Sequence, residues 1–391
     1  MIFFERRKLR KQIKSVLNQA ATWRAGHEDV MTTGQLAFLD EHISKASQAR
    51  TGGDIDEMTA AGNALVACIE RLDPPKPLAV CREWFDVFVV AFSVAMAFRA
   101  YFYQPFQIPT GSMQPTLYGI HAEPLDPAAM TAFDRQPLKL LKWFVTGKSF
   151  KVVRAKASGT VTFGDARLKP GYIPVIVNGV AHFVPSDVID SSPTSYGLRG
   201  GVKLLQRVKA GDVLWSGIVT SGDFLFVNRW KWNFCHPKRG EVMVFSTSGM
   251  KDLNQPGTHY IKRMMGLPNE TLQAKAPNLL VNGVAVTEPE RVGQIARKER
   301  HADWVRERDT YKGFNPYDQN NVLGQRRIPG RTLITSADTV TLGPDEYYAM
   351  GDNSFNSFDS RAWGPVPERN LLGPASFVHW PFTSPRWGRI K

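Results

Sequence analysis

The chain has 391 residues, and its 49 Lys and Arg against 36 Asp and Glu give a formal net charge of +13 at pH 7. We find no zinc-ligand spacing, phosphate-binding loop or recognised DNA-binding motif, so the basic charge does not indicate a nucleic-acid partner. Of the three cysteines, Cys68, Cys81 and Cys235, only the last follows the apolar segment described below. That part of the chain therefore cannot contain a disulfide framework, but its length of about 290 residues suffices for a hydrophobic core.

The N-terminal part has helical patterns over about 5–24, 32–49 and 55–71, separated by glycine-containing turns. The proline-rich segment 73–77 ends these patterns and predicts a stiff linker. We therefore expect a small helical cytoplasmic region over 1–77. The start of the chain has no long apolar stretch and no small-residue cleavage site, so a cleaved signal peptide is not expected.

An apolar run from Val87 to Phe98 follows, which at twelve residues is shorter than the roughly 20 that a spanning helix needs. Flanking aromatic residues extend it, and Arg99 can reach the interface, so we expect one transmembrane helix over 84–103. A buried amphipathic helix is the alternative. The first fourteen residues carry six Lys and Arg, which predicts a cytoplasmic N-terminus. Residues 1–83 carry a net charge of only +1, so most positive charge follows the span, where it would attract anionic lipid heads.

Directly after this segment, Ser112 lies in a loop of sequence Gln-Ile-Pro-Thr-Gly-Ser-Met-Gln-Pro, residues 107–115. Pro109 and Pro115 fix φ near −65° on either side, and Gly111 permits a sharp turn, so the loop presents the serine rigidly. Most serines in such loops are solvated turn residues. A catalytic role for Ser112 therefore needs a partner.

A candidate partner occurs about 150 residues later, at Lys262 in the strand-like stretch 258–265. A strand would place Tyr260, Lys262 and Met264 on one largely apolar face. Desolvation lowers the pKa of a lysine, as a lysine base requires. With an ordinary pKa near 10.4, only roughly one lysine in 2,500 would be neutral at pH 7, a penalty of about 4.6 kcal/mol. An exposed lysine in an edge strand is the alternative.

A third segment, 351–364, combines small polar residues and glycines in a turn after the strand-like stretch 346–350. Such a turn can orient other groups. Taken singly, Asp352 and Asp359 are typical of turn-capping carboxylates, and Arg361 is typical of a surface ion pair.

Together and in this order, the three segments resemble the type I signal peptidases, membrane-bound serine proteases that remove signal peptides from exported proteins. The likeness covers 108–117, 222–229, 239–245, 260–263, 351–364 and 373–375. The resemblance implies that Ser112 is the nucleophile, that Lys262 is the general base, and that Ser357 hydrogen-bonds and orients the lysine. It also implies that Thr110 and the Ser112 backbone N–H donate to the oxyanion. One amine can take the serine proton and return it to the leaving amine, so no histidine, metal or cofactor is expected.

The resemblance further implies how a substrate would be recognised. Five residues would line shallow pockets for small side chains, namely Ile108, Met113, Leu117, Tyr260 and Ile261. Cleavage at Ala-x-Ala sites is then expected. Ordinary core packing is the alternative for these five, and for Leu117 both interpretations are open. Two scaffold ion pairs are implied, Asp352 with Arg263 and Asp359 with Arg361.

The resemblance also implies a place in the cell. This is the bacterial cytoplasmic (inner) membrane, crossed once, with the catalytic domain outside the cytoplasm. The expected partners are preprotein signal peptides, membrane lipids and the protein export machinery.

After the span, short runs of alternating hydrophobicity are typical of strands. They cover 223–229, 241–246, 258–265 and 346–350. Asn282-Gly283 between two apolar stretches predicts a hairpin. We therefore expect a mainly β catalytic domain, formed by 104–118 and 221–391, with the family's antiparallel β architecture.

The clearest departure from the family is an insertion of about a hundred residues, 119–220. Strand and turn patterns near 157–161 and 208–214 predict an extra small β module. It is faintly similar to biotinyl and lipoyl domains, but it lacks a carrier-lysine hairpin, so no cofactor is assigned. A second departure is Ser354-Phe355, where relatives commonly place an Arg, so any ion pair using that Arg is missing. Residues 287–330 are charged and predict a surface elaboration.

Three other interpretations were weighed against this one. A Ser-His-Asp triad using His259 or His379 near Asp352 lacks a nucleophile-elbow motif. The self-cleaving SOS repressor proteases share a Ser/Lys dyad but lack a membrane span. A catalytically idle, membrane-anchored β module that binds signal peptides or envelope partners would have no chemical need for the four predicted catalytic side chains. The sequence therefore favours the enzyme.

Overall fold

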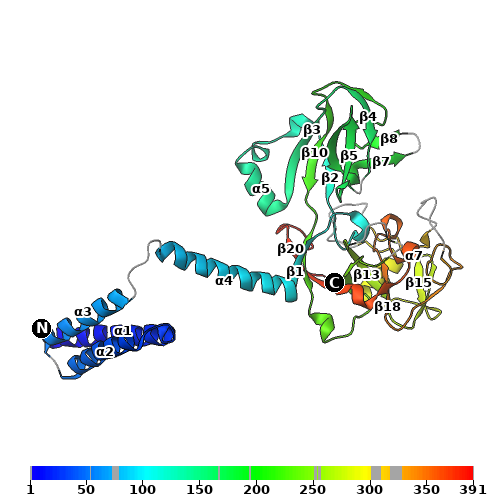
Figure 1. The fold of residues 1–391 in the computed structure, drawn as a ribbon. Helices are drawn as coiled ribbons and strands as arrows, with labels where there is room; N and C mark the ends of the chain where they lie inside the picture. The colour runs from blue at the N-terminus through cyan, green and yellow to red at the C-terminus, as the bar shows by residue number, and fades with distance from the viewer. Residues whose placement is uncertain are drawn as a thin grey trace. The chain divides into compact units, whose positions relative to one another are not determined.

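The computed structural model describes residues 2–52, 54–72, 79–165, 168–192, 195–250, 253, 257–300, 310–317 and 328–390. The chain forms two compact units, Met1–Val94 and Ala95–Lys391. The first unit is helical, and the second is built mainly of β-strands (Figure 1). The predicted linker 73–77 lies outside the described residues.

Three helices of the first unit pack around a small core. They are α1 (Ile2–His27), α2 (Thr33–Gly52) and α3 (Ile55–Leu72). Each contacts the other two, and Leu39, Leu65 and Cys68 are buried between them. Arg24 on α1 also pairs with Asp40 on α2 at 2.7 Å. All three predicted helices are therefore present, each within three residues of its predicted ends.

A fourth helix, α4 (Ala79–Tyr101), contains the apolar segment. Its stretch Cys81–Tyr101 is long and apolar enough to cross a membrane, and its most apolar window is not buried in the structure. The alternative of a buried helix is therefore not supported. The predicted span ran to Tyr103, but the helix ends earlier because Tyr103 already pairs with Asn228 in a sheet.

The largest sheet of the second unit joins segments that are far apart in the sequence. In order across the sheet, its strands are β1 (Tyr103–Gln107), β11 (Phe224–Asn228), β20 (Leu371–Trp380), β12 (Val242–Ser246), β13 (His259–Gly266), β18 (Glu346–Met350) and β19 (Val366–Pro367), with β21 (Gly388–Arg389) beside β20. Every pairing is antiparallel. The four strands predicted from alternation all lie in this sheet. Since β1 leads into the loop of Ser112 and β13 carries Lys262, the sheet positions both.

A second antiparallel sheet extends the same region. Its strands are β16 (Val284–Ala285), β15 (Asn278–Val281), β14 (Thr271–Lys275) and β17 (Val340–Thr341). The predicted hairpin is present between β15 and β16, where Asn282 and Gly283 have φ of 51° and 81°. Two successive positive φ values are what a tight hairpin turn of this kind requires, which explains the Asn-Gly pair.

The prediction of a surface elaboration over 287–330 is wrong for some of the described residues, although others such as Glu288, Glu290 and Arg297 are exposed. Val292 and Ile295 on α6 (Glu290–Ala296) are fully buried, and Tyr311 is buried as well. They pack in one hydrophobic cluster with the strands of the second sheet. Apolar residues three apart form one face of a helix even within a charged stretch. The high charge of this segment led to the prediction of an exposed segment instead of an amphipathic helix with a buried face.

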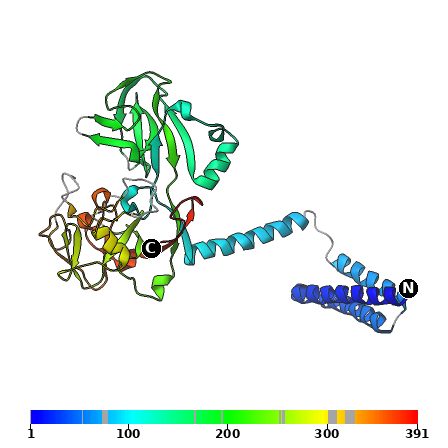
Figure 2. The same ribbon diagram turned by 180° about the vertical axis from the view of Figure 1, so that it is seen from behind.

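The insertion forms a β module of its own. One sheet contains β2 (His121–Pro124), β10 (Val213–Thr220) and β3 (Lys148–Arg154), a second contains β6 (Val180–Pro185), β5 (Tyr172–Val177), β4 (Gly159–Phe163) and β9 (Arg207–Val208), and β7 (Ile189–Ser192) pairs with β8 (Ser195–Leu198). The first two sheets share one hydrophobic cluster, which includes Trp215 and Val175. Helix α5 (Leu138–Thr146) lies beside β3, at the end of the module away from β7 and β8 (Figures 1 and 2).

Asp223 holds together three parts of the second unit. Its buried carboxylate accepts a hydrogen bond from the Tyr118 backbone N–H at 2.7 Å. It also pairs with Arg386 near the end of the chain, at 2.7 and 2.9 Å. Burial raises the pKa of Asp223, and the guanidinium of Arg386 opposes that rise. Tyr118 precedes the insertion and Asp223 follows it, so this contact closes the base of the inserted module.

Replacing Arg386 with Gln removes the countercharge and leaves the Asp223 carboxylate buried. We expect a loss of about 3 kcal/mol in the free energy of unfolding, since removal of one partner of a buried ion pair strands the other charge. Thermal unfolding in detergent measures this as a lower Tm. Arg389→Gln is the matched control, because Arg389 is exposed and forms no ion pair among the described residues, and it should shift Tm by only about 1 °C. Equal shifts for both variants would contradict the assignment.

Candidate active site

Ser112 lies in a short 3-10 turn, Gly111–Met113, which follows β1. Its side chain is largely buried, and Asn353 holds the backbone of the turn. The Asn353 N–H donates to the Ser112 carbonyl at 3.0 Å, and its Nδ2 donates to the Gly111 carbonyl at 3.1 Å. The loop of the serine is therefore fixed by a residue that lies 242 positions after Gly111.

At Gly351 the turn after β18 packs closely against the backbone of Ser112. A Cβ atom at this position would lie 2.6 Å from the Ser112 carbonyl oxygen and 2.2 Å from Ser357 Oγ. Real Cβ atoms do not approach so closely, so only glycine fits between these groups. Steric crowding therefore explains why the 351–364 segment begins with a glycine.

Lys262 extends from β13 to the serine. Its Nζ is hydrogen-bonded to Ser112 Oγ at 2.8 Å and donates to the Ile261 carbonyl at 3.0 Å. The same nitrogen lies 5.6 Å from the centre of the Tyr260 ring. Only 5% of Lys262 is exposed. The structure thus brings together the two side chains that the sequence analysis paired.

Burial lowers the pKa of Lys262 from 10.5 to about 8, because the ammonium form loses its hydration. Nearby charges have smaller and opposing effects: Asp359 and Asp352 raise the pKa, and Arg361 lowers it. With a pKa of about 8, roughly one lysine in ten is neutral at pH 7, compared with about one in 3,000 at 10.5. The amine is therefore available as a base near neutral pH.

Two buried ion pairs adjoin the dyad, and both match the pairs implied by the resemblance. The guanidinium of Arg263 donates two hydrogen bonds to the Asp352 carboxylate, at 2.7 and 2.6 Å. The guanidinium of Arg361 likewise donates two to the Asp359 carboxylate, each at 2.8 Å. None of these four side chains has exposed surface. Asp359 also accepts from the Gly351 N–H at 3.0 Å. The second pair therefore supports the backbone next to the serine.

No role was predicted for Thr116, Tyr311 or Asn353, although all three contribute hydrogen bonds near the dyad. Arg263 donates to Thr116 Oγ1 at 3.3 Å, and Thr116 shares a hydrogen bond of 2.8 Å with the Tyr311 hydroxyl. Asn353 lies next to Asp352 in the predicted turn 351–364, and this position was the only sequence feature that could have indicated its role. Tyr311 lies in the charged stretch, where no pattern connects it to the serine loop.

Two predicted catalytic side chains make no hydrogen bond to the dyad in the part of the chain that the structure describes. Thr110 is exposed at the start of the 3-10 turn, and its side chain does not cap it. Ser357 is buried, and its Oγ has no hydrogen-bond partner among the described residues. The bond from Ser357 to Lys262 implied by the resemblance is therefore not formed in this structure.

The five predicted substrate contacts fall into two sets. Ile108, Met113 and Leu117 are at most 2% exposed and share one hydrophobic cluster. Tyr260 and Ile261 are half-buried and reach the surface. In this structure the first three residues pack as core, which is the alternative weighed for them, and the last two are open to a substrate.

The histidine alternative is not supported by the contacts of its members. His259 packs edge-on against Phe106 with ring centres 5.3 Å apart, and His379 stacks on Phe226 at 4.2 Å. Asp352 is occupied by its bidentate bond to Arg263. The described residues also include no group of three or more His, Cys, Asp or Glu placed to hold a metal ion.

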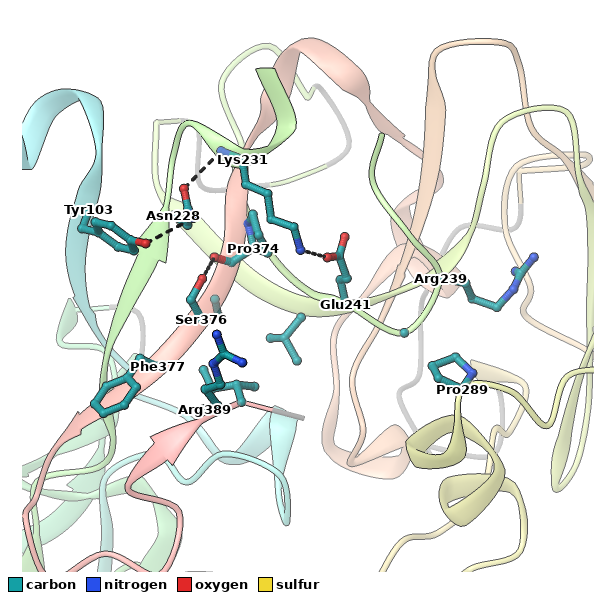
Figure 3. Close-up of a pocket in the computed structure, with 14 residues that line it drawn as sticks. Tyr103, Asn228, Lys231, Arg239, Glu241, Pro289, Pro374, Ser376, Phe377 and Arg389 are labelled. Atoms are coloured by element: carbon teal, nitrogen blue, oxygen red, sulfur yellow. Dashed lines mark hydrogen bonds and ion pairs between the residues drawn. The ribbon is translucent and has the colours of Figure 1, made fainter. Parts of the chain in front are cut away.

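A cavity of about 730 Å³ on the large sheet contains none of the predicted catalytic residues (Figure 3). Residues that line it include Tyr103, Asn228, Lys231, Arg239, Glu241, Pro289, Pro374, Ser376, Phe377 and Arg389. Lys231 pairs with Glu241 at 2.5 Å, and Arg239 pairs with Glu270 outside the cavity. Two of the basic residues in its lining are therefore already paired with carboxylates.

Comparison with known proteins identifies the relatives of this chain. A protein-family model described as "Signal peptidase, peptidase S26" matches residues 217–380, less than half of the chain. Signal peptidase I T of Bacillus subtilis is 28% identical over 42% of this chain and 68% of its own length. Signal peptidase I of Pseudomonas aeruginosa is 30% identical over 43% of this chain and 62% of its own length. A signal peptidase I of Bacillus amyloliquefaciens is 31% identical over 38% of this chain and 62% of its own length.

The chain thus spans between about three fifths and two thirds of the length of these relatives. A solved signal peptidase I from Enterococcus faecalis V583 is 21% identical and overlaps 36% of this chain and 97% of that one, with a TM-score of 0.22. The family match includes Lys262 and the 351–364 segment. The loop of Ser112 lies outside it, on the other side of the insertion.

The buried amine should reduce stability, and replacing Lys262 with Met should reveal this. The folded state has the lowered pKa, so below about pH 8 folding carries a penalty of about 3 kcal/mol, which disappears as the pH rises through 10.5. We therefore expect Lys262→Met to raise Tm at pH 7 and to lose most of that advantage at pH 10. Lys238→Met, at an exposed lysine, is the control and should change neither value. If Lys262→Met were less stable than the wild type at pH 7, burial of the amine would not be destabilising.

Proposed function

We propose that this chain, whose residues 217–380 match the signal peptidase family, peptidase S26, is a serine endopeptidase that removes N-terminal signal peptides from exported preproteins. The main support for this proposal is the 2.8 Å hydrogen bond between Ser112 Oγ and Nζ of the buried Lys262. A hydroxyl and a neutral amine at this distance can serve as nucleophile and general base in forming and hydrolysing an acyl-enzyme. No observation favours the alternative of a catalytically idle binding module.

In the first half of the reaction, the neutral amine of Lys262 removes the Ser112 proton while Oγ attacks the carbonyl carbon of the scissile peptide bond. We propose that the resulting oxyanion is stabilised by the Ser112 N–H and the Thr110 hydroxyl, the roles that the resemblance implies for them. Thr110 is exposed beside the 3-10 turn, so it can rotate toward a bound substrate. The lysine then gives its proton to the leaving amine, and the signal peptide stays attached to Ser112 as an ester.

In the second half, Lys262 takes a proton from a water molecule, which attacks the ester and releases the signal peptide. The proton returns to Ser112 Oγ, and the lysine is neutral again. Ser357 is proposed to orient the amine during this cycle. Its Oγ is buried and unpaired among the described residues, so it has the capacity for one more hydrogen bond when Nζ moves between Ser112 and the substrate.

Substrate choice is proposed to be for small side chains at Ala-x-Ala sites. Tyr260 and Ile261 border the dyad on β13 and are half-buried, so they can contact a peptide directly. Ile108, Met113 and Leu117 belong to the hydrophobic cluster against which Ile261 packs, and they would limit the depth of a pocket on that side of β13. A shallow site with such a floor would admit alanine and exclude larger residues.

The chain is proposed to act at the bacterial cytoplasmic membrane, with α4 as its single span and 1–77 on the cytoplasmic side. The catalytic domain is proposed to comprise 104–118 and 221–391, with 119–220 as an inserted module. Support comes from the apolar stretch Cys81–Tyr101 and from the basic N-terminus. Membrane lipids and the export machinery are the proposed partners there.

Cleavage of a preprotein with an Ala-x-Ala site by the detergent-solubilised chain tests the proposed activity. Ser112→Ala and Lys262→Met should each lower the rate by about 10³-fold or more, since the dyad acts as a unit. Thr110→Val should cost about 10²- to 10³-fold through loss of one oxyanion donor. Ser376→Ala, on the same sheet but in the cavity of Figure 3, is the matched control. A wild type that cuts no preprotein, or a fully active Lys262→Met, would refute the proposal.

The pH dependence of kcat/KM reports the base. Only the neutral amine can accept the serine proton, so kcat/KM should rise with pH and level off above about 8, the pKa of Lys262. Cleavage rates between pH 6 and 10 measure this profile, with thermal unfolding at each pH as the control for stability. A midpoint near 6.5 would point to a histidine base instead.

A further inference from the structure

Helix α5 of the insertion has its apolar side directed outward. Leu140, Leu141 and Phe144 are 60%, 60% and 57% exposed. The two lysines of the same helix, Lys139 and Lys142, are partly buried. This is the reverse of a surface helix in a soluble domain, which turns its polar residues to water and its apolar stripe to the core.

Specific contacts hold α5 in this orientation. Lys142 pairs with Asp134 at 2.5 Å, and the carboxylate of Asp134 is almost fully buried and also accepts from Thr131. At the other end of the helix, the Phe144 carbonyl accepts a hydrogen bond from Trp380 Nε1 at 2.6 Å. Rotation of α5 toward the core would break both contacts. The outward apolar side is therefore a fixed property of the fold.

Residues from two neighbouring segments enlarge this apolar side into one patch. Phe133 precedes the helix and is 61% exposed, and Phe382 follows β20 and is 52% exposed. The rings of Phe144 and Phe382 lie 5.8 Å apart, edge to face. We call the five residues Phe133, Leu140, Leu141, Phe144 and Phe382 the α5 surface. Large exposed apolar side chains gathered from three segments mark a contact site rather than scattered surface residues.

A lipid bilayer is the occupant that the surrounding chain favours. The apolar helix α4 ends at Tyr101, and β1 of the same unit begins at Tyr103, so only one residue separates the proposed span from the folded domain. The insertion 119–220 contains 13 Lys and Arg against 7 Asp and Glu, and Arg135 and Lys148 beside α5 are exposed. Aromatic and leucine side chains flanked by basic residues are typical of helices that lie in an anionic membrane interface.

We propose that the α5 surface inserts into the interfacial layer of the membrane that α4 spans, as a second attachment of this chain to anionic lipids. This inference rests on the proposed membrane anchor. Segment 138–146 lies outside the residues 217–380 that match the signal peptidase family, so the attachment belongs to the insertion. Two separate attachments would restrict how the domain tilts and would hold Ser112 at a set height above the bilayer.

Depth-dependent quenching on the full-length chain tests this attachment. In a variant with Cys68→Ala, Cys81→Ser and Cys235→Ser, an NBD fluorophore is placed at Leu141→Cys. The chain is reconstituted in phosphatidylcholine vesicles containing about a quarter phosphatidylglycerol, with or without brominated acyl chains. Two matched sites are labelled separately: Leu205→Cys, which is 68% exposed on the insertion outside the α5 surface, and Val90→Cys in α4, which is 64% exposed.

Brominated lipid should reduce the fluorescence at position 141 by about twofold and leave position 205 almost unchanged. Adding Leu140→Glu and Phe144→Glu should abolish the quenching at 141. Equal quenching at 141 and 205 would overturn the proposal. A blue-shifted signal at 141 that brominated lipid leaves intact, and that weakens as protein is diluted in lipid, would overturn it in favour of contact between copies of the chain. Position 90 reports separately on the anchor: loss of quenching there alone would refute α4 as the span while leaving the result at 141 decisive for α5.

Discussion

The structure of the site depends on keeping the amine of Lys262 out of water. Its desolvation lowers the pKa to about 8, and this holds only while no unpaired carboxylate lies nearby to attract the ammonium form. Asp352 and Asp359 are both close enough to raise the pKa, but each is bound by an arginine within the same buried region. The two ion pairs thus have an electrostatic consequence as well as a structural one, since they supply rigidity to the turn beside Ser112 and leave little net charge at the lysine.

The contact between Tyr118 and Asp223 explains how a hundred-residue insertion leaves the dyad in place. The Tyr118 N–H and the Asp223 carboxylate meet at 2.7 Å, and β2 and β10, the first and last strands of the module, pair with each other. The ends of the insertion are therefore adjacent in space, and within the module Gly171 lies so close to the Ser112 loop that a Cβ atom there would be 2.5 Å from the Pro109 carbonyl oxygen. Gly119 adds to this closure, because a Cβ there would lie 2.3 Å from the Thr110 carbonyl. The module can carry its own surface, such as α5, without entering the network that positions the nucleophile.

The sequence was sufficient for the parts that depend on local pattern. Alternation identified four strands of the large sheet, Asn282-Gly283 identified a hairpin, and the resemblance paired Ser112 with Lys262. It was insufficient where a contact joins distant segments without a pattern of its own. Asn353 fixes the serine loop across 242 positions, and Tyr311 reaches Thr116 across 195. The burial of α6 was missed for a related reason, since charge in a segment says little about the two or three apolar residues that anchor it.

Direct titration of the Lys262 amine shows whether it can act as a base near neutral pH. The chain is labelled at lysine side chains with ¹³C and ¹⁵N in detergent, and the Lys262 resonance is assigned by its absence in Lys262→Met. We expect a midpoint of about 8, well separated from the other lysines, with the same midpoint in Ser112→Ala because desolvation is the main cause. A midpoint near 10.5 would show that the amine is charged at neutral pH, and the Ser112–Lys262 mechanism would then be contradicted.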